Sequence, residues 1–203
     1  ASMTSFPIKS KKVHVIGHAV DLVNFSNKKE EYKLQNFLIL SRISPSKNIE
    51  IAIDGFLNSK FKDCNLDIIG GPLNKSDEVY FAKLKEKYTT NNVNFLGKIN
   101  HTNLPEVLKN YDVHFNCSKN GFFDKSVLET LSCEIINFYV NKDFNILFEN
   151  NLYQFDDSSE LSRKLDNLIN LSTEEIKNTL HKSKKELQNN SLSSLNSRLE
   201  PYL

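Results

Sequence analysis

Two cations, Arg42 and Lys47, lie around a proline in the stretch LSRISPSKN at 40–48. The apolar run FLIL at 37–40 precedes them, and a helix-like pattern begins at Lys47. A helix N-terminus carries unpaired N–H groups and partial positive charge, so a lysine placed there is unfavourable unless it shares an anion. The pair therefore indicates a binding site for an anion such as a diphosphate. Two ordinary solvent-exposed loop cations are the alternative.

A second loop with suitable chemistry, CSKNGFFDKSVLETLSC at 117–133, leads into a helix that is expected to start near Lys125. Backbone N–H groups of its glycine-containing turn can hold phosphate, and Glu129 can accept hydrogen bonds from ribose hydroxyls. The alternative is a capped helix with an exposed glutamate. Lys125 is either a further phosphate contact or a solvated residue. The expected ligand-binding residues of this loop are Gly121, Phe122, Phe123, Asp124, Lys125 and Glu129.

The two phenylalanines of this loop, Phe122 and Phe123, either stack on a ligand or pack in the interior, and packing is favoured. Weaker signals come after two other expected strands. Gly71 ends LDIIGG at 66–71, and Ile99 comes two residues after VNFLG at 93–97. Glycine at a strand end permits close approach of a ligand, although turns need glycine for structural reasons as often. Gly71 and Ile99 are thus minor candidates for a ligand contact.

The histidines and cysteines show no catalytic or metal-ligand spacing. His114 lies within an apolar strand and is expected to be a core residue. Cys117 and Cys133 are expected to be small core residues as well. No Asp-x-Asp run is present, so we expect no metal and no cofactor. No role is assigned to any of the five histidines, His14, His18, His101, His114 and His181.

The elements that must position these residues alternate along the chain. Short apolar runs indicate strands at 13–17, 37–40, 66–71, 93–97, 111–118 and 134–140, with helical spacing at 47–59, 76–88, 104–110 and 125–133 between them. Continuous apolar runs are typical of strands that are buried on both faces of a parallel sheet. The alternation predicts an α/β fold, a Rossmann-like doubly wound parallel sheet flanked by helices. In such sheets ligands bind beyond the carboxyl ends of the strands, where Arg42, Lys47 and the second loop lie.

Two amphipathic stretches at 158–171 and 172–188 predict C-terminal helices, the second starting at Ser172. We expect residues 1–12 to be a tag remnant or linker, residues 13–190 to form one Rossmann-like domain, and residues 191–203 to form a tail, either a last helix or a strap. The 203 residues include 26 basic and 25 acidic side chains. This balance gives no support for nucleic-acid binding. Without a signal peptide or a membrane-spanning apolar run, a cytoplasmic location is expected.

Five ordered stretches resemble the C-terminal, donor-binding domain of glycosyltransferases of the GT-B fold, retaining family four (glycosyl transferases group 1). They are VIGHAVDLVNF at 15–25, LSRISPSKNIEIAIDGF at 40–56, LDIIGG at 66–71, VNFLGKINHTNLPEVLKNYDVHFNCS at 93–118 and GFFDKSVLETLSC at 121–133. Each stretch alone is weakly specific, but their order and intervals match over nearly the whole chain. Val20, Asp21 and Phe25 resemble the stretch with which the chain enters this domain.

The resemblance implies transfer of a sugar from a nucleoside diphosphate sugar to an acceptor hydroxyl with retention. Arg42 and Lys47 match the family's pair that binds the donor diphosphate and stabilises its departure, without a required metal. Ile99 falls where a backbone group contacts the nucleobase, and Glu129 matches the glutamate that binds ribose. Gly121 stands where the family's first motif glutamate is usually found, and Glu134 stands where glycine is usual.

A GT-B enzyme has two Rossmann-like domains, and the resemblance covers one. We therefore expect the N-terminal acceptor-binding domain to be the missing partner, any membrane contact to be made through that half, and this half alone to be inactive. Alternatives are a degenerate donor-binding or scaffold domain and a nucleotide-sugar epimerase-like or phosphorylase-like protein. A dinucleotide-dependent oxidoreductase is disfavoured because SRISPSKN at 41–48 contains no glycine fingerprint.

Overall fold

Five parallel strands form the centre of the computed structural model, which describes residues 18–88, 92–148 and 152–202. The strand order is β3-β2-β1-β4-β5, so the chain winds outward from β1 in both directions. The predicted doubly wound α/β fold is confirmed, and the strand expected at 13–17 lies outside the described residues. The strands are β1 (Asn36–Leu40), β2 (Asn65–Ile69), β3 (Val93–Gly97), β4 (Val113–Asn116) and β5 (Ile136–Tyr139).

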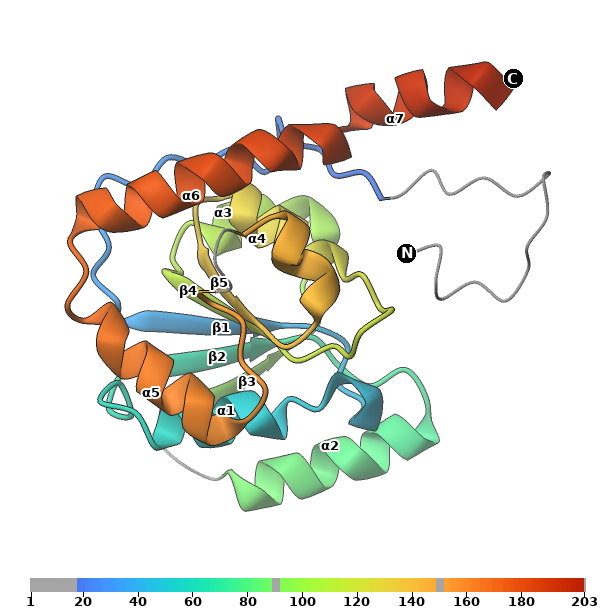
Figure 1. Cartoon of the computed structure of the whole chain (residues 1–203). Coiled ribbons are helices and arrows are strands. Elements are labelled where there is room, and N and C mark those ends of the chain that lie inside the picture. Colours follow the sequence, from blue (N-terminus) through green and yellow to red (C-terminus); the bar gives the residue numbers. More distant parts are fainter. Residues whose placement is uncertain (1–17, 89–91, 149–151, 203) are drawn as a thin grey trace.

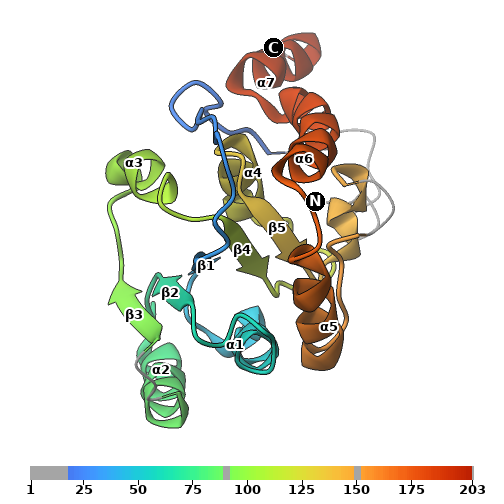
Figure 2. The ribbon, with the colours of Figure 1, turned by 90° about the vertical axis from the view of Figure 1, so that its left-hand side faces the viewer.

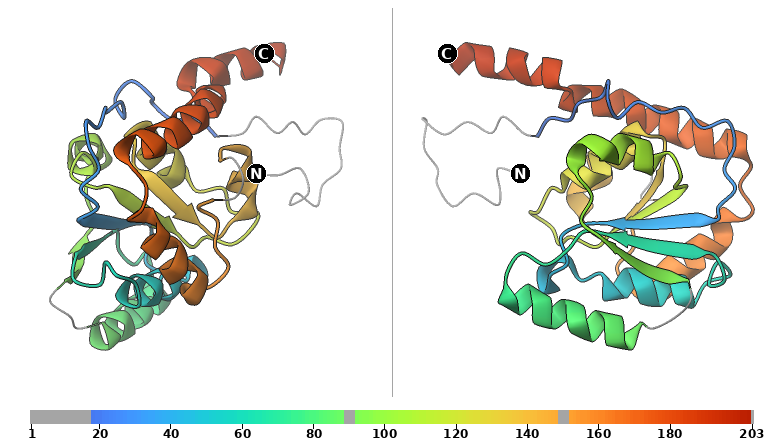
Figure 3. Two further views of the ribbon diagram at one scale, coloured as in Figure 1. Left: turned by 60° about the vertical axis from the view of Figure 1, so that its left-hand side comes forward. Right: turned by 180° about the vertical axis from the view of Figure 1, so that it is seen from behind.

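Helices cover both faces of this sheet (Figures 1 and 2). The helices α1, α2 and α5 lie on one face, and α3, α4 and α6 lie on the other, an arrangement that the two views of Figure 3 also show. Every residue of β4 and β5 is buried as a result, which explains their continuous apolar character. The helices are α1 (Glu50–Leu57), α2 (Lys75–Lys87), α3 (Leu104–Leu108), α4 (Lys125–Ser132), α5 (Ser158–Leu168), α6 (Thr173–Leu187) and α7 (Leu192–Leu199).

Aromatic rings fill the core between the sheet and α1. Phe37 on β1 lies 5.1 Å from Phe56 on α1 and 5.9 Å from Phe115 on β4, measured between ring centroids. Tilted and offset contacts of this kind add to the free energy gained from burying the rings. The core thereby fixes β1 and β4 side by side, and the loops after these two strands carry the candidate site.

Helix starts are set by side-chain caps. Asp124 accepts a hydrogen bond from the backbone of Ser126 at the start of α4. Ser172 and Glu175 form a reciprocal capping box at the start of α6, as the sequence predicts. Each cap satisfies N–H groups that the first helical turn leaves without partners. Polar residues that look unremarkable in sequence therefore decide where α4 and α6 begin.

Gly70 allows the carboxyl ends of β1 and β2 to approach closely. Its φ is +141°, and a Cβ atom at this position would lie 1.8 Å from the backbone oxygen of Ser41. Only glycine fits such a contact without moving the backbone. The Ser41 N–H donates to the Ile69 carbonyl at 3.1 Å, which fixes the direction in which the chain leaves β1 toward Arg42.

A cluster of charged residues closes the opposite edge of the sheet, where the strands begin. The Lys29 ammonium lies 3.1 Å from Asp112, and the Lys29 backbone N–H donates to Glu134 at 2.8 Å. Glu134 also pairs with Lys184 of α6 at 2.8 Å. Glu134 has a φ of 59°, in the left-handed region that favours glycine. We call Lys29, Asp112, Glu134 and Lys184 the amino-edge clamp, because they fasten the segment before β1 to the domain.

The predicted tail forms α7, which extends away from the body of the domain (Figure 1). It begins next to the first described residues, where the Val20 N–H donates to the Asn190 carbonyl at 2.8 Å. The Arg198 guanidinium donates to the His18 carbonyl at 3.3 Å. The segment at 18–20 and α7 are thus held together. None of the helices described is both long and apolar enough to cross a membrane.

Candidate functional site

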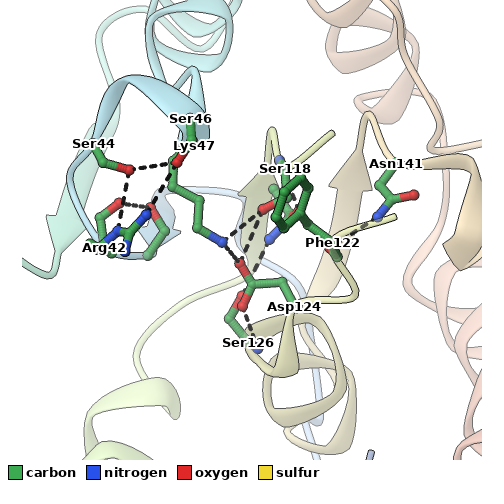
Figure 4. A network of polar contacts seen from close by, with 11 residues as sticks. Arg42, Ser44, Ser46, Lys47, Ser118, Phe122, Asp124, Ser126 and Asn141 are labelled. Atoms are coloured by element: carbon green, nitrogen blue, oxygen red, sulfur yellow. Dashed lines mark hydrogen bonds and ion pairs between the residues drawn. The ribbon is translucent and has the colours of Figure 1, made fainter. Parts of the chain in front are cut away.

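A polar cavity of about 420 Å³ opens at the carboxyl ends of the strands. It lies where the loop after β1 faces the loop after β4 (Figure 4). Four of the predicted ligand-binding residues take part in it. We call this cavity the polar pocket, and it is lined by Arg42, Ser46, Lys47, Ser118, Phe122 and Asp124.

Arg42 is exposed and held by two serines of its own loop. Its Nε lies 3.3 Å from Ser44 Oγ, and its Nη2 lies 3.3 Å from Ser46 Oγ. Both acceptors are neutral, so the charge of the guanidinium is not balanced by these contacts. The arginine side chain is oriented along the pocket wall with its positive charge available to an anion.

Lys47 lies in a short 3-10 helix, Pro45–Lys47, and not at the start of α1 as predicted. Asn48 adopts a left-handed conformation with φ 46°, which separates this turn from α1. The ammonium group points across the pocket to the loop after β4. It donates to Ser118 Oγ at 3.0 Å and to Asp124 Oδ2 at 2.5 Å. Arg42 and Lys47 therefore converge on one pocket from neighbouring positions of one loop.

Asp124 combines two contacts through its two oxygens. Oδ1 accepts the cap hydrogen bond from Ser126, and Oδ2 accepts from both Lys47 and Ser118. Burial acts to raise the pKa of Asp124, but the adjacent Lys47 ammonium and the hydrogen bonds from Ser126 and Ser118 outweigh burial and lower it below its ordinary value. The carboxylate is consequently ionised at neutral pH.

The glycine-containing turn before α4 is shaped by its own contacts. Gly121 has a φ of 85°, and its N–H donates to the Asp143 carboxylate at 2.8 Å. The Phe122 N–H donates to the Lys119 carbonyl at 3.2 Å. These two amides already have acceptors, so a phosphate cradle at this turn would have to use the amides from Phe123 onward.

The two phenylalanines of the turn separate. Phe123 packs on Phe144 with ring centroids 4.7 Å apart, and its ring stacks on His18 at 5.5 Å. Phe122 lies at the rim of the polar pocket and is 66% exposed. Interior packing, favoured from the sequence, thus holds for Phe123 and is wrong for Phe122. Lys125, the next cation, is exposed and does not line the pocket.

Glu129 lies inside α4, facing the loop after β3. Its exposed fraction is only 8%, so the alternative of an exposed glutamate is wrong. His101 Nε2 lies 3.0 Å from Glu129 Oε1. Burial raises the pKa of Glu129, although the hydrogen bond from His101 acts in the opposite direction. A nearly buried carboxyl with one hydrogen-bonded oxygen is well suited to accept hydroxyl groups.

Reasoning from the sequence missed Ser46 and Ser118 of the polar pocket, and it also missed His101. His101 begins a 3-10 helix, His101–Asn103, four residues after the end of β3, and its ring packs on Phe25 at 5.4 Å. A second cavity, of about 460 Å³, adjoins His101 and Phe25. Arg42 and Asp124 were singled out because they lie in loops at the carboxyl ends of strands. The same rule, applied to histidines, would also have found His101.

The minor candidates lie near the site without lining the polar pocket. The Gly71 carbonyl accepts from the Ile43 N–H at 3.1 Å, beside Arg42 in the chain, and Ile99 is half-buried against the core. His114 is confirmed as a core residue, with Nδ1 2.7 Å from Asn137 Oδ1, and burial lowers its pKa. Cys117 and Cys133 are buried, as predicted. Among the described residues no group of three or more His, Cys, Asp or Glu side chains is placed to hold a metal ion.

Solved structures with this fold include proteins that bind nucleotides. HepE from Anabaena, in complex with UDP-glucose, superposes with a TM-score of 0.76 at 17% identity, over 91% of this chain and 55% of that one. A glycosyltransferase from Rickettsia africae superposes with a TM-score of 0.77 at 18% identity, over 96% of this chain and 57% of that one. This chain therefore spans about half the length of these two proteins.

A third structure matches over almost its full length. The C-terminal domain of LpcC, a glycosyl transferase group 1 family protein from Francisella tularensis, superposes with a TM-score of 0.67 at 15% identity, over 84% of this chain and 97% of that one. Because these sequence identities are low, the superpositions establish the fold alone. No curated protein matches the chain in sequence. The model of one family, glycosyl transferases group 1, does match it over residues 21–189. With this match over most of its length, and with the fold of a GT-B C-terminal domain, the chain belongs to the glycosyl transferases group 1 family.

Proposed function

We propose that the chain is the donor-binding half of a retaining glycosyltransferase that moves a sugar from a nucleoside diphosphate sugar to an acceptor hydroxyl. The observation that carries the proposal is the convergence of Arg42 and Lys47 on one pocket beside the N-terminus of α4. Two cations and a helix N-terminus form a suitable site for a diphosphate. Family membership and the UDP-glucose bound to HepE support the same ligand class.

The proposed chemistry depends on leaving-group electrostatics. As the bond between sugar and diphosphate breaks, negative charge grows on the departing diphosphate, and the sugar becomes oxocarbenium-like. Arg42 and Lys47 stabilise that charge, and each preorganised donor supplies on the order of 3 kcal/mol. Amides at the start of α4 add to the stabilisation through their alignment with the helix axis. No step in this scheme uses a metal ion or a cofactor.

Glu129 is proposed to bind the ribose of the donor. His101 occupies one carboxyl oxygen, and the other is available to accept a hydroxyl. The backbone near Ile99 is proposed to contact the nucleobase. Gly71, Phe123 and Lys125 remain candidates for further donor contacts, whereas the Gly121 N–H already donates to Asp143. The ribose and base would then lie on the β3 side of the polar pocket, and the sugar would lie toward Phe122.

The acceptor is proposed to bind to a second Rossmann-like domain that this chain does not include. The supporting observation is that the chain covers only 55% of HepE and 57% of the Rickettsia protein. We expect the 203-residue chain alone to bind donor and to transfer little or no sugar.

A non-catalytic donor-binding domain is the second candidate function, because Gly121 places no carboxylate where the family usually has one. The two candidates differ in one measurement. The catalytic one predicts sugar transfer when the chain is combined with an acceptor-binding domain, and the non-catalytic one predicts donor binding alone.

Titration calorimetry with pyrophosphate and with UDP tests the proposed diphosphate site. Arg42→Ala and Lys47→Ala should each weaken binding at least about tenfold, since each removes a charged hydrogen-bond donor. Lys62→Ala, which changes an exposed lysine away from the pocket, is the matched control. Circular dichroism should show that all three variants stay folded. Equal affinities of both pocket variants and the wild type would contradict the assignment.

A further inference from the structure

Asp124 places a negative charge inside a pocket that otherwise suits an anion. Its Oδ2 accepts a hydrogen bond from the Lys47 ammonium at 2.5 Å, and Ser118 Oγ is hydrogen-bonded to both groups. The side chains of Lys47 and Asp124 are 19% and 17% exposed at the wall of the open pocket, so water screens the pair only in part. Among the residues lining this pocket, two cations face one carboxylate, which leaves a formal charge of one positive unit.

The helix cap does not explain why this residue is an acid. Capping uses Oδ1, which accepts from Ser126, and asparagine or serine caps a helix about as well as aspartate. The charge acts through Oδ2, on Lys47. Any phosphate that reaches the Lys47 ammonium must therefore displace the carboxylate or lie beside it, and like charges in contact raise the free energy of the complex.

We propose that Asp124 is a specificity-determining residue that selects the sugar-bearing donor against free diphosphates. The terminal phosphate of a free diphosphate has a second ionisation near pH 6, so at neutral pH it carries about one more negative charge than the sugar ester does. Repulsion by the Asp124 carboxylate grows with the charge of the ligand. It therefore weakens binding of the nucleoside diphosphate product and of pyrophosphate more than it weakens binding of the donor. This inference rests on the proposed function.

The consequence for the reaction is a bias toward product release. When the sugar leaves, the diphosphate gains charge while Lys47 remains within reach of its own counter-ion. Return of the Asp124 carboxylate to Lys47 then competes with the product for the same ammonium. Asp124 thus lowers the positive charge of the pocket and also promotes release of the diphosphate product.

The deciding variant is Asp124→Asn, which removes the charge and keeps one oxygen for the cap. Its amide NH2 replaces the oxygen that accepts from Lys47, and Ser118 Oγ remains as an acceptor for the ammonium. In calorimetry at low salt, we expect this variant to bind pyrophosphate and UDP about five- to tenfold more tightly than wild type, and UDP-glucose less than about threefold more tightly. Raising the ionic strength should shrink these gains. Asp157→Asn, the same change at the cap of α5, is the matched control and should leave all three affinities unchanged.

The outcomes separate this inference from the proposed function. If wild type and Arg42→Ala both fail to bind pyrophosphate and UDP, the proposed function is wrong. If Arg42→Ala weakens binding while Asp124→Asn leaves it unchanged or weaker, the diphosphate site stands and the Asp124 proposal is wrong, because the carboxylate then serves to orient Lys47. An equal gain for all three ligands would overturn the selection against free diphosphates.

Discussion

Two lysine–aspartate pairs lie at opposite edges of the same sheet, and they differ in what surrounds them. Lys29 and Asp112 meet at 3.1 Å at the amino ends of the strands, with side chains 9% and 8% exposed. Lys47 and Asp124 meet at 2.5 Å at the carboxyl ends, about twice as exposed. Asp112 also accepts from the Gln35 N–H, and Lys29 donates to the Lys109 carbonyl, so the protein itself supplies the further partners of the first pair.

The second pair faces a cavity and a second cation, Arg42. The first pair is the more buried of the two, although Lys29 also borders a cavity of about 590 Å³. Because its further partners come from the protein, this pair holds the chain in place. An ion pair at the wall of an open pocket can exchange one member for a ligand. The same two residue types thus serve the fold at one edge and are available to function at the other.

The largest effect should come from breaking each pair at its lysine. Lys29→Ala leaves Asp112 buried without its cation and should lower the free energy of unfolding by about 3 kcal/mol. Lys47→Ala leaves Asp124 beside an open cavity that water can enter, and should cost about 1 kcal/mol or less. Urea denaturation of both variants measures this difference. Similar losses for the two variants would show that the edges are equally structural.

Glu129→Ala examines the carboxyl edge alone. We expect about tenfold weaker binding of UDP, because a ribose acceptor is lost, and unchanged binding of pyrophosphate, which has no ribose. Calorimetry with both ligands measures the two affinities. His101→Ala is the companion variant and should have a smaller effect in the same direction. Equal weakening of pyrophosphate binding would mean that Glu129 acts on the diphosphate region, against its proposed role.

Glu134 tests the amino edge further, because its side chain stabilises the fold while its backbone conformation destabilises it. Its carboxylate holds Lys29 and Lys184, while its φ of 59° is unfavourable for a residue with a Cβ atom. Glu134→Ala and Glu134→Gly both lose the carboxylate, and glycine also relieves the backbone. We expect the glycine variant to be more stable than the alanine variant by about 1 kcal/mol. Denaturant unfolding that ranks alanine above glycine would refute this account.

The smallest effect concerns pH and two acids of α4 and its cap. The pKa of Glu129 is raised above its ordinary value of 4.5, so its contribution to stability is fully present below that value and declines as the pH rises through the raised value. The pKa of Asp124 is lowered below 3.8, so its contribution is present above 3.8 and is lost as the pH falls through the lowered value.

Thermal unfolding from about pH 3 to about pH 7 tests these opposite signs. Relative to wild type, Glu129→Gln should gain stability as the pH rises, by about 1 kcal/mol or less, whereas Asp124→Asn should lose stability relative to wild type as the pH rises out of the acidic end of the range. If the stability difference between Glu129→Gln and wild type were the same at every pH, the raised pKa of a buried Glu129 carboxyl would be contradicted.

Much of the fold can be predicted from the sequence because both faces of the sheet are covered. Burial on both sides makes strands such as β4 and β5 continuous apolar runs, and caps such as Ser172 mark helix starts. The short turn at Pro45–Lys47 was not predicted, since a left-handed Asn48 is a local choice that periodicity does not show. Strands can be predicted because they depend on a pattern of several residues, whereas this turn depends on the conformation of a single residue.

The location of the site could be predicted from the sequence, but the contacts between its residues could not. Strand ends of a parallel sheet lie at one edge, which is enough to bring Arg42, Lys47 and Asp124 together. The pairings Lys47–Asp124 and His101–Glu129 join residues 77 and 28 positions apart, and their geometry depends on how the loops pack. Phe122 faces outward because the turn at Gly121 is fixed by Asp143, 22 residues later, a contact that no local pattern indicates.

The outward position of Phe122 also makes the pocket accessible to spectroscopy. The chain contains no tryptophan, so Phe122→Trp would place the sole indole of the molecule at the mouth of the polar pocket. Indole fluorescence depends on nearby water and charge, and a ligand that fills the cavity changes both. One substitution would thereby turn the domain into an optical sensor of its own occupancy, with no attached dye.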